Sequence, residues 1–178
     1  MALRPLITEE QISIRVSQIA AEIDRDYPDG KLYLVAILKG AFFFLADLAR
    51  AIERDVFIDF MSISSYGKGK TSSGEVKIIK DLDIELAGAD VLIIEDIIDS
   101  GVTLSYLTAV LQNRKPRSLR IATLLDKPER RKKHVDVAYV GFRIPDEFVV
   151  GYGLDYAEQY RNLREVCVLD DPEGATGQ

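Results

Sequence analysis

Strand-length apolar runs alternate with helix-length segments along the first two thirds of the chain. The runs are LYLVAIL (32–38), VFIDFMSIS (56–64), VLII (91–94) and LRIATLL (119–125), and the segments between them at 41–54 and 102–114 have helical patterns. Strands that are apolar nearly throughout are buried on both faces, and helical crossovers between them favour parallel pairing. The sequence therefore predicts an α/β fold, with a mainly parallel twisted sheet flanked by helices.

The two ends of the chain carry other patterns. TEEQ (8–11) has the form of a capping box, and apolar residues recur at helical spacing from Ile12 to Ile23. Short strands are expected at 137–141, 148–152 and 166–169, so the last third is predicted to be a small β subdomain or sheet edge. Residues 66–75, YGKGKTSSGE, have no hydrophobic periodicity and are expected to form a mobile loop, and 171–178 a flexible tail.

Composition narrows the classes of function. The 178 residues suit one domain, and the net charge of −6 argues against a broad nucleic-acid-binding surface. One cysteine and one histidine exclude an internal disulfide and a Cys/His zinc site. Cys167 is expected in the core and His134 on a surface loop. With no signal-peptide pattern and no apolar stretch near ~18 residues, we expect a cytoplasmic protein without membrane contact.

Three carboxylates follow the apolar strand within VLIIEDIIDSGVTL (91–104). Glu95 and Asp96 stand at the predicted carboxyl end, where open α/β sheets bind ligands, and Asp99 follows. Carboxylates this close repel one another and lose hydration when buried, which indicates a cationic or hydroxyl-rich ligand. Magnesium suits such hard oxygen ligands, and Asp99 is placed to act as a general base.

The turn that follows has the features of an anion site. Ser100, Gly101 and Thr103 precede or begin the predicted helix, where backbone N–H groups and hydroxyls bind phosphate. A sugar phosphate would satisfy both halves of this segment. The alternatives are a solvated strand end and a phospho-acceptor receiver domain. The latter places its acids on the first strand and lacks the phosphate turn.

EDIIDSGVT resembles the phosphoribosyl pyrophosphate motif of type I phosphoribosyltransferases. LKGAFFFLADLAR (38–50), SSYG (64–67), LLDKP (124–128) and GFRIPDEFVVGYGLDYAEQYRNL (141–163) are similar to the hypoxanthine-guanine phosphoribosyltransferase family. The resemblance spans roughly residues 32–170. It implies transfer of 5-phosphoribosyl to N9 of a 6-oxopurine with release of pyrophosphate. It also implies one domain, with a core at about 30–140 and a hood built from the N-terminal segment and about 141–170.

Residue roles follow from the resemblance. Glu95 and Asp96 would hold the ribose diol and magnesium, and Asp155 a second magnesium. Asp99 would be the base near purine N7, and residues 99–103 would wrap the 5′-phosphate. Val102 stands where some family members carry lysine, which removes a direct charge contact but not the backbone cradle.

The remaining roles concern pyrophosphate and the purine. Lys39 and Gly40 match the pyrophosphate loop, which often has a cis peptide, and Arg161 would contact the leaving pyrophosphate. Lys127 would donate to the purine 6-oxo group, Phe148 would stack on the ring and Val149 would use its backbone. Ser65 and Tyr66 would form the root of a mobile lid. The basic run Arg130, Arg131, Lys132 and Lys133 is expected to be a solvated face.

Several alternatives stay open at the level of sequence. The residues do not rank hypoxanthine, guanine and xanthine, because Val149 acts through its backbone. A transferase-like RNA-binding regulator is disfavoured by the acidic composition and the complete purine motif. The resemblance implies a homodimer or homotetramer, and the apolar AFFFLADLA helix suits either an interface or the core.

Overall fold

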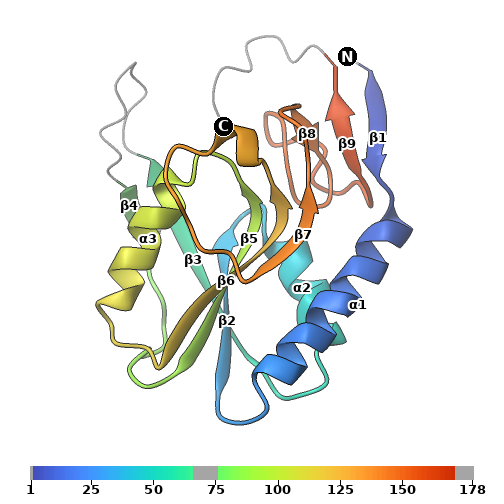
Figure 1. Cartoon of the computed structure of the whole chain (residues 1–178). Helices are drawn as coiled ribbons and strands as arrows, with labels where there is room; N and C mark the ends of the chain where they lie inside the picture. Colours follow the sequence, from blue (N-terminus) through green and yellow to red (C-terminus); the bar gives the residue numbers. More distant parts are fainter. Residues whose placement is uncertain (1, 66–75, 171–178) are drawn as a thin grey trace.

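The computed structural model describes residues 2–65 and 76–170 (Figure 1). Its central sheet has the strand order β4-β3-β2-β5-β6-β7. All neighbours pair in parallel except β3 and β4. The predicted α/β fold with a mainly parallel sheet is confirmed. The strands are β2 (Leu32–Leu38), β3 (Phe57–Ser65), β4 (Val76–Lys80), β5 (Asp90–Ile98), β6 (Ser118–Asp126) and β7 (Tyr139–Arg143).

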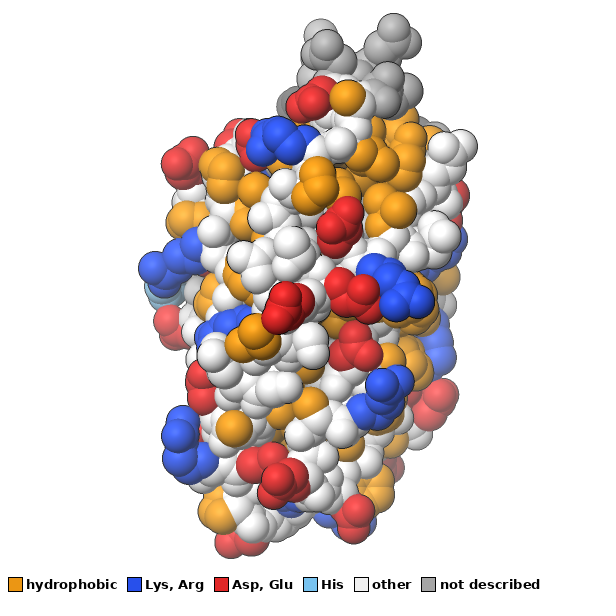
Figure 2. Space-filling model, turned by 90° about the vertical axis from the view of Figure 1, so that its right-hand side faces the viewer, with side chains coloured by type: hydrophobic (Ala, Val, Ile, Leu, Met, Phe, Trp, Pro, Cys, Tyr) orange, Lys and Arg blue, Asp and Glu red, His pale blue; other side chains and the backbone are white. Residues whose placement is uncertain are grey.

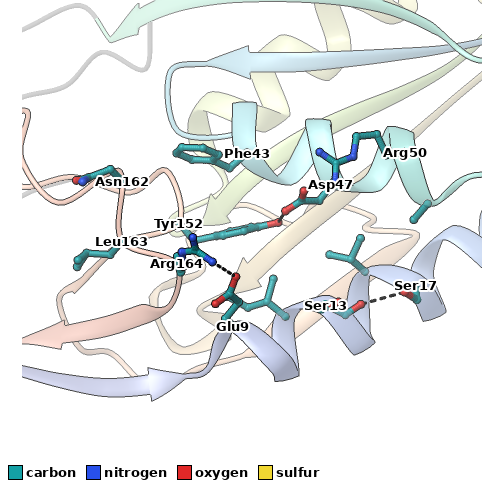
Figure 3. Close-up of a pocket in the computed structure, with 13 residues that line it drawn as sticks. Glu9, Ser13, Ser17, Phe43, Asp47, Arg50, Tyr152, Asn162, Leu163 and Arg164 are labelled. Atoms are coloured by element: carbon teal, nitrogen blue, oxygen red, sulfur yellow. Dashed lines mark hydrogen bonds and ion pairs between the residues drawn. The ribbon is translucent and has the colours of Figure 1, made fainter.

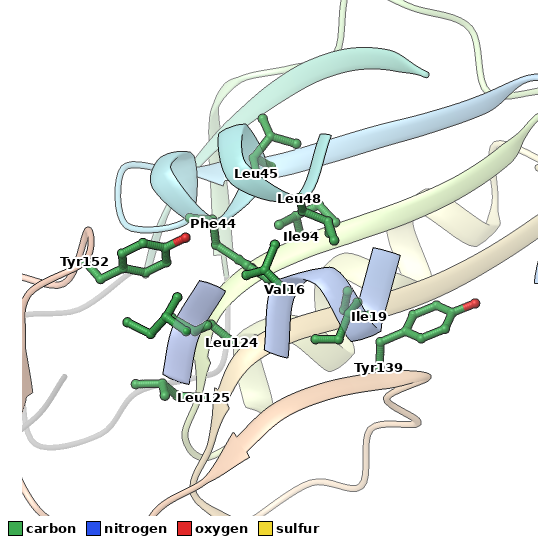
Figure 4. Packing of buried hydrophobic residues seen from close by; sticks show 14 of the residues in the cluster. Val16, Ile19, Phe44, Leu45, Leu48, Ile94, Leu124, Leu125, Tyr139 and Tyr152 are labelled. Carbon is green, nitrogen blue, oxygen red and sulfur yellow. The ribbon is translucent and has the colours of Figure 1, made fainter. Parts of the chain in front are cut away.

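Helices cover both faces of the sheet. Helices α1 (Glu9–Asp26) and α2 (Phe42–Ala51) lie on one face and α3 (Val102–Gln112) on the other (Figure 1). Successive side chains of a strand point to opposite faces, so Leu92 and Ile94 pack with α1 and α2, whereas Val91 and Ile93 pack with α3. Figure 4 shows the first of these clusters, where Val16 and Ile19 of α1 meet Phe44 and Leu48 of α2.

The N-terminal helix begins as predicted. Thr8 caps α1 by accepting a hydrogen bond from the Gln11 backbone, and the Gln11 side chain accepts one from the Thr8 backbone. Each bond satisfies a backbone N–H at the helix start. The buried residues of α1 are Ile12, Val16, Ile19, Ala20 and Ile23, which recur at helical spacing.

A second sheet joins the two ends of the chain. It contains β1 (Leu3–Ile7), β9 (Val166–Leu169) and β8 (Val149–Val150), in the antiparallel order β1-β9-β8. Cys167 is buried there as expected. The strand predicted at 148–152 is reduced to two residues, because Gly151 and Tyr152 turn the chain with φ of +97° and +50°.

Strand β5 is longer than the apolar run VLII indicates. Its ladder with β6 continues through Glu95↔Thr123 and Ile97↔Leu125 to Ile98↔Asp126. Glu95 and Asp96, predicted at the carboxyl end of the strand, lie within its last part. Backbone pairing to β6 carries the strand through two charged residues that periodicity alone excludes.

The predicted loop at 66–75 and tail at 171–178 lie outside the described residues. Among the residues that are described, no helix is long and apolar enough to cross a membrane. Figure 2 shows the face that carries α1, where acidic, basic and hydrophobic side chains are interspersed and the basic ones form no continuous stripe.

Candidate functional site

A cavity of about 260 Å³ lies at the carboxyl end of the central sheet. The end of β5, the turn after it, the start of α3 and the end of β6 contribute to it. The structure thus brings together six of the predicted site residues: Glu95, Asp99, Ser100, Gly101, Thr103 and Lys127. The apolar part of the lining is Ile37, Ile63, Ile97, Ile98 and Leu104.

The two adjacent acids of β5 have different neighbours. Glu95 lines the cavity, whereas Asp96 lies against the backbone of Gly40, where an added Cβ would be 1.6 Å from Oδ2 of Asp96. The regular alternation of the strand also breaks here. Ile97 packs with the α1–α2 cluster and Ile98 with the α3 cluster, the reverse of the pattern before Glu95.

Desolvation shifts the pKa of both acids, although each keeps part of its surface exposed. Desolvation raises the pKa of Glu95 well above its ordinary value, and the neighbouring Asp96 charge adds to the shift. Desolvation also raises the pKa of Asp96 to about 6, against hydrogen bonds from the backbone of Ile97 and Asp96 and the positive charge of Arg161. Such a pair gains from a bound cation or from hydroxyl donors.

Gly101 lets the turn after β5 pack closely against the basic segment. This residue has φ of +76° and is the N-cap of α3, so it brings no side chain to the helix start. A Cβ there would lie 2.5 Å from the carbonyl oxygen of Lys133. The backbone N–H groups of Lys132 and Lys133 in turn donate to the carbonyl oxygen of Ser100, at 2.9 and 3.1 Å. The basic segment therefore holds the turn in place.

The basic run is not uniformly solvated, which corrects the sequence prediction. Nε of Arg130 lies 2.9 Å from Oδ1 of Asp99, and Arg131 forms a close ion pair with Asp126. Lys132 and Lys133 are exposed as predicted. His134 is exposed too, with Nε2 2.8 Å from Oδ1 of Asp136. The sequence gives no sign of the first two pairs, because they depend on the distance between the ends of β5 and β6.

Lys127 is buried at the end of β6, with only 5% of its surface exposed. Its backbone N–H donates to Ile98 across the strand ends at 3.0 Å. Its Nζ lies 4.0 Å from Oδ1 of Asp146. Burial lowers the pKa of this lysine, opposed by the negative charges of Asp99 and Asp146. A buried ammonium in a cavity suits a hydrogen bond to a ligand carbonyl.

A second group of predicted residues gathers on the Asp96 side of β5. The backbone of Gly153 lies against Gly40, such that a Cβ on Gly153 would be 2.1 Å from the carbonyl oxygen of Gly40. Arg161 donates from Nη1 to the carbonyl oxygen of Gly153 at 2.8 Å, and its Nη2 lies 3.0 Å from Asp155. Its buried Nε has no hydrogen-bond partner among the described residues. Gly40, Asp96, Asp155 and Arg161 thus form one cluster.

A cis peptide bond lies at the start of the Lys39–Gly40 loop, between Leu38 and Lys39. The sequence raised this possibility for Lys39–Gly40, so the bond lies one residue earlier. The side chain of Lys39 is exposed, and its Nζ is 2.8 Å from Glu158.

Phe148 and Val149, which the resemblance assigns to the purine, lie outside the lining of the cavity. Val149 is buried in β8, and the ring of Phe148 makes an edge contact with Tyr156 at 5.8 Å. Ser65 is the last residue of β3, and Tyr66 lies outside the described residues. Val102 is the first residue of α3. Within the described ranges, no three His, Cys, Asp or Glu side chains are grouped to hold a metal ion by themselves.

A larger cavity of about 480 Å³ lies between α1, α2 and the segment 152–164 (Figure 3). Its lining includes Asp47 and Tyr152, joined by a hydrogen bond, and Glu9 and Arg164, joined by an ion pair. None of the predicted site residues lines it. This larger hollow is therefore not the place where the predicted site residues meet.

Comparison with known proteins agrees with this arrangement. The model of the phosphoribosyl transferase domain matches residues 6–157. The chain is 54% identical over 164 residues to a hypoxanthine-guanine phosphoribosyltransferase of Bacillus subtilis, covering 92% of this chain and 91% of that one. Identity to the Mycobacterium avium protein of the same name is 53%, covering 93% and 84%. A crystal structure of a hypoxanthine phosphoribosyltransferase from Staphylococcus aureus has a TM-score of 0.92 at 50% identity, covering 98% and 94%.

Proposed function

The chain belongs to the phosphoribosyl transferase domain family, and we propose that it is a purine salvage enzyme. It transfers 5-phosphoribosyl from 5-phosphoribosyl 1-diphosphate to N9 of hypoxanthine or guanine, giving IMP or GMP and pyrophosphate. The observation that carries this proposal is the shared cavity of Glu95, Lys127 and the Asp99–Thr103 turn. It combines acceptors for a diol, donors for a phosphate and a buried cation for the purine.

The sugar phosphate is bound along the end of β5. Glu95 and Asp96 hold the ribose hydroxyls, and the turn from Asp99 to Thr103 wraps the 5′-phosphate. Gly101 adds no side chain at the helix start, and Ser100 and Thr103 add hydroxyl donors. Val102 brings no positive charge, so backbone N–H groups carry the phosphate contact.

Magnesium fits the donor set of this site. Glu95 and Asp96 are adjacent carboxylates whose pKa values are raised chiefly by desolvation, so a divalent cation favours their ionised forms. Asp155, which forms an ion pair with Arg161, would contribute to a second ion. When bound with the donor, magnesium neutralises charge that develops on the leaving pyrophosphate.

Protein groups then complete the transfer. The bond from C1′ to the pyrophosphate oxygen breaks while N9 of the purine bonds to C1′, and Asp99 accepts the proton from N7. Lys127 donates to the 6-oxo group. Arg161 and the Lys39–Gly40 backbone contact the departing pyrophosphate. Phe148 stacks on the purine, and the backbone of Val149 contacts its edge.

We propose that the sheet β1-β9-β8 and residues of about 141–170 form the hood over the purine, with the core at about 30–140. Ser65 and Tyr66 contribute the root of a lid that excludes water from the cationic sugar. The active protein is a homodimer or homotetramer in the cytoplasm, and it does not act on nucleic acid or membranes.

The test is pyrophosphate release from the donor with magnesium and, in turn, hypoxanthine, guanine, xanthine and uracil. Release with hypoxanthine or guanine, lost with EDTA and restored by Mg²⁺, is the expected result. Release with xanthine alone would instead make it a xanthine-preferring transferase. Donor binding without release for any base would overturn the catalytic assignment while leaving the family intact.

A further inference from the structure

The carboxylate of Asp99 has a charge partner that the proposed reaction does not use. Nε of Arg130 lies 2.9 Å from Oδ1 of Asp99, and Nη1 of Arg130 lies 3.3 Å from Oδ1 of Asp146. Arg130 is the last residue of η1 (Pro128–Arg130), a single 3₁₀ turn that directly follows Lys127. Its guanidinium therefore connects the turn after β5 to the loop before β8.

The geometry of this contact indicates that it is exchangeable. Oδ1 of Asp99 is buried and accepts no well-aligned hydrogen bond from the described residues, although Nε of Arg130 is close. Guanidinium–carboxylate pairs are strongest when two N–H groups point along the lone pairs. A close but misaligned contact holds the carboxylate by charge, so a better-aligned N–H donor can replace it.

The other nearby cations do not contact the Asp99 carboxylate in the same way. The Lys127 ammonium lies 4.0 Å from Asp146. Arg131 is paired with Asp126 and reaches Asp99 through Nε only at its backbone carbonyl oxygen, at 3.3 Å. Arg130 also keeps 41% of its side-chain surface exposed, so packing does not fix its guanidinium beside Asp99.

We propose that Arg130 is a positioning residue that holds the Asp99 carboxylate toward the cavity before the purine binds and then yields it to the purine N7–H. The inference rests on the proposed function, in which Asp99 contacts the purine. During the exchange the guanidinium stays anchored to Asp146, and the charge near Asp99 is retained while its hydrogen-bond partner changes.

The experiment measures steady-state kinetics of Arg130→Gln, Arg130→Lys and the control Arg114→Gln with donor, magnesium and hypoxanthine. Arg114 forms an ion pair of 2.7 Å with Asp81, outside the cavity lining. We expect Arg130→Gln to lower kcat/KM for hypoxanthine about 10-fold, a part of the ~10²-fold loss that a misplaced catalytic group causes. The KM for the donor should not change. Arg130→Lys should keep most of the wild-type kcat/KM, because the contact depends on charge rather than on a bidentate hydrogen bond.

Two results would overturn the inference: a loss in Arg130→Gln no larger than in Arg114→Gln, or a loss that Arg130→Lys does not reduce. The double variant Asp99→Asn/Arg130→Gln supplies a further criterion, because residues that act as one unit are not additive. We expect kcat/KM for hypoxanthine to differ less than about twofold between the double variant and Asp99→Asn. A further loss in the double variant as large as that caused by Arg130→Gln alone would contradict the positioning role. If Asp99→Asn itself stays active, the proposed role of Asp99 fails instead.

Discussion

The phenolic hydroxyl of Tyr152 donates a hydrogen bond of 2.5 Å to the carboxylate of Asp47 (Figure 3). The bond connects the segment after β8 to α2, the helix that follows the Lys39–Gly40 loop. Burial and the hydrogen bond to Asp47 both raise the pKa of Tyr152, so the hydroxyl remains a donor. Its ring also stacks near Phe43, with centroids 6.1 Å apart.

Replacing Tyr152 by phenylalanine should loosen this connection. The change removes one hydrogen-bond donor from a partly buried carboxylate, so we expect the free energy of unfolding to fall by about 1–2 kcal/mol. We also expect the KM for 5-phosphoribosyl 1-diphosphate to rise. Urea unfolding and initial rates measure the two effects. Tyr106→Phe is the control, since Tyr106 is 41% exposed and its loss should leave both values unchanged. Equal effects in both variants would contradict the argument.

The contact between Gly153 and Gly40 leads to a second prediction. In Gly153→Ala the new Cβ would lie 2.1 Å from the Gly40 carbonyl oxygen, at a φ of +103°. We expect the Lys39–Gly40 loop to be displaced and the KM for 5-phosphoribosyl 1-diphosphate to rise about 10-fold or more, on the scale of a misplaced binding group. Gly88→Ala is the matched control, because its φ is +73° with no atom within 4 Å of the Cβ. It carries backbone strain of about 1–2 kcal/mol without the collision, so its donor KM should stay normal.

Asp99→Asn tests the proposed general base. The amide preserves the shape of the side chain but does not accept the purine proton, so we expect kcat to fall about 10²-fold or more. Donor binding, measured by titration calorimetry with magnesium, should be retained. Asp83→Asn is the control, since its side chain is 83% exposed. Near-normal turnover in Asp99→Asn would remove Asp99 from the mechanism.

Much of the fold follows from local pattern in the sequence. The apolar runs from Leu32 and Leu119 and the capping box at Thr8 encode their own secondary structure, because burial and helix capping act within a few residues. Strand β1 was missed for the opposite reason. LRPLI contains proline and arginine and has little strand propensity, and its pairing partner β9 lies at the other end of the chain.

The candidate site also combines features that the sequence predicts with features that it does not. Glu95, Asp99 and Gly101 lie within one short segment, so their proximity can be read from the sequence. The ion pair between Arg130 and Asp99 cannot, because a run of basic residues has the same composition whether it is solvated or paired. The basic run reaches Asp99 and Asp126 only because the ends of β5 and β6 are adjacent in the folded sheet.

Asp90 provides a prediction about stability and pH. Its carboxylate, 5% exposed at the start of β5, accepts hydrogen bonds from Nε of Arg117 at 3.1 Å and from Ser118 at 2.6 Å. The Arg117 hydrogen bond is the main cause of a lowered pKa of Asp90. A carboxyl group whose pKa is lower in the folded than in the unfolded state stabilises the fold above the unfolded pKa of about 3.9. That stabilisation is lost as the pH falls through the folded pKa.

Asp90→Asn should therefore lower the urea midpoint clearly at pH 7 and much less at pH 3, whereas Asp83→Asn, at an exposed position, should change the midpoint little at either pH. A difference from wild type that is equal at both pH values would show that the ionised carboxylate is not the stabilising group.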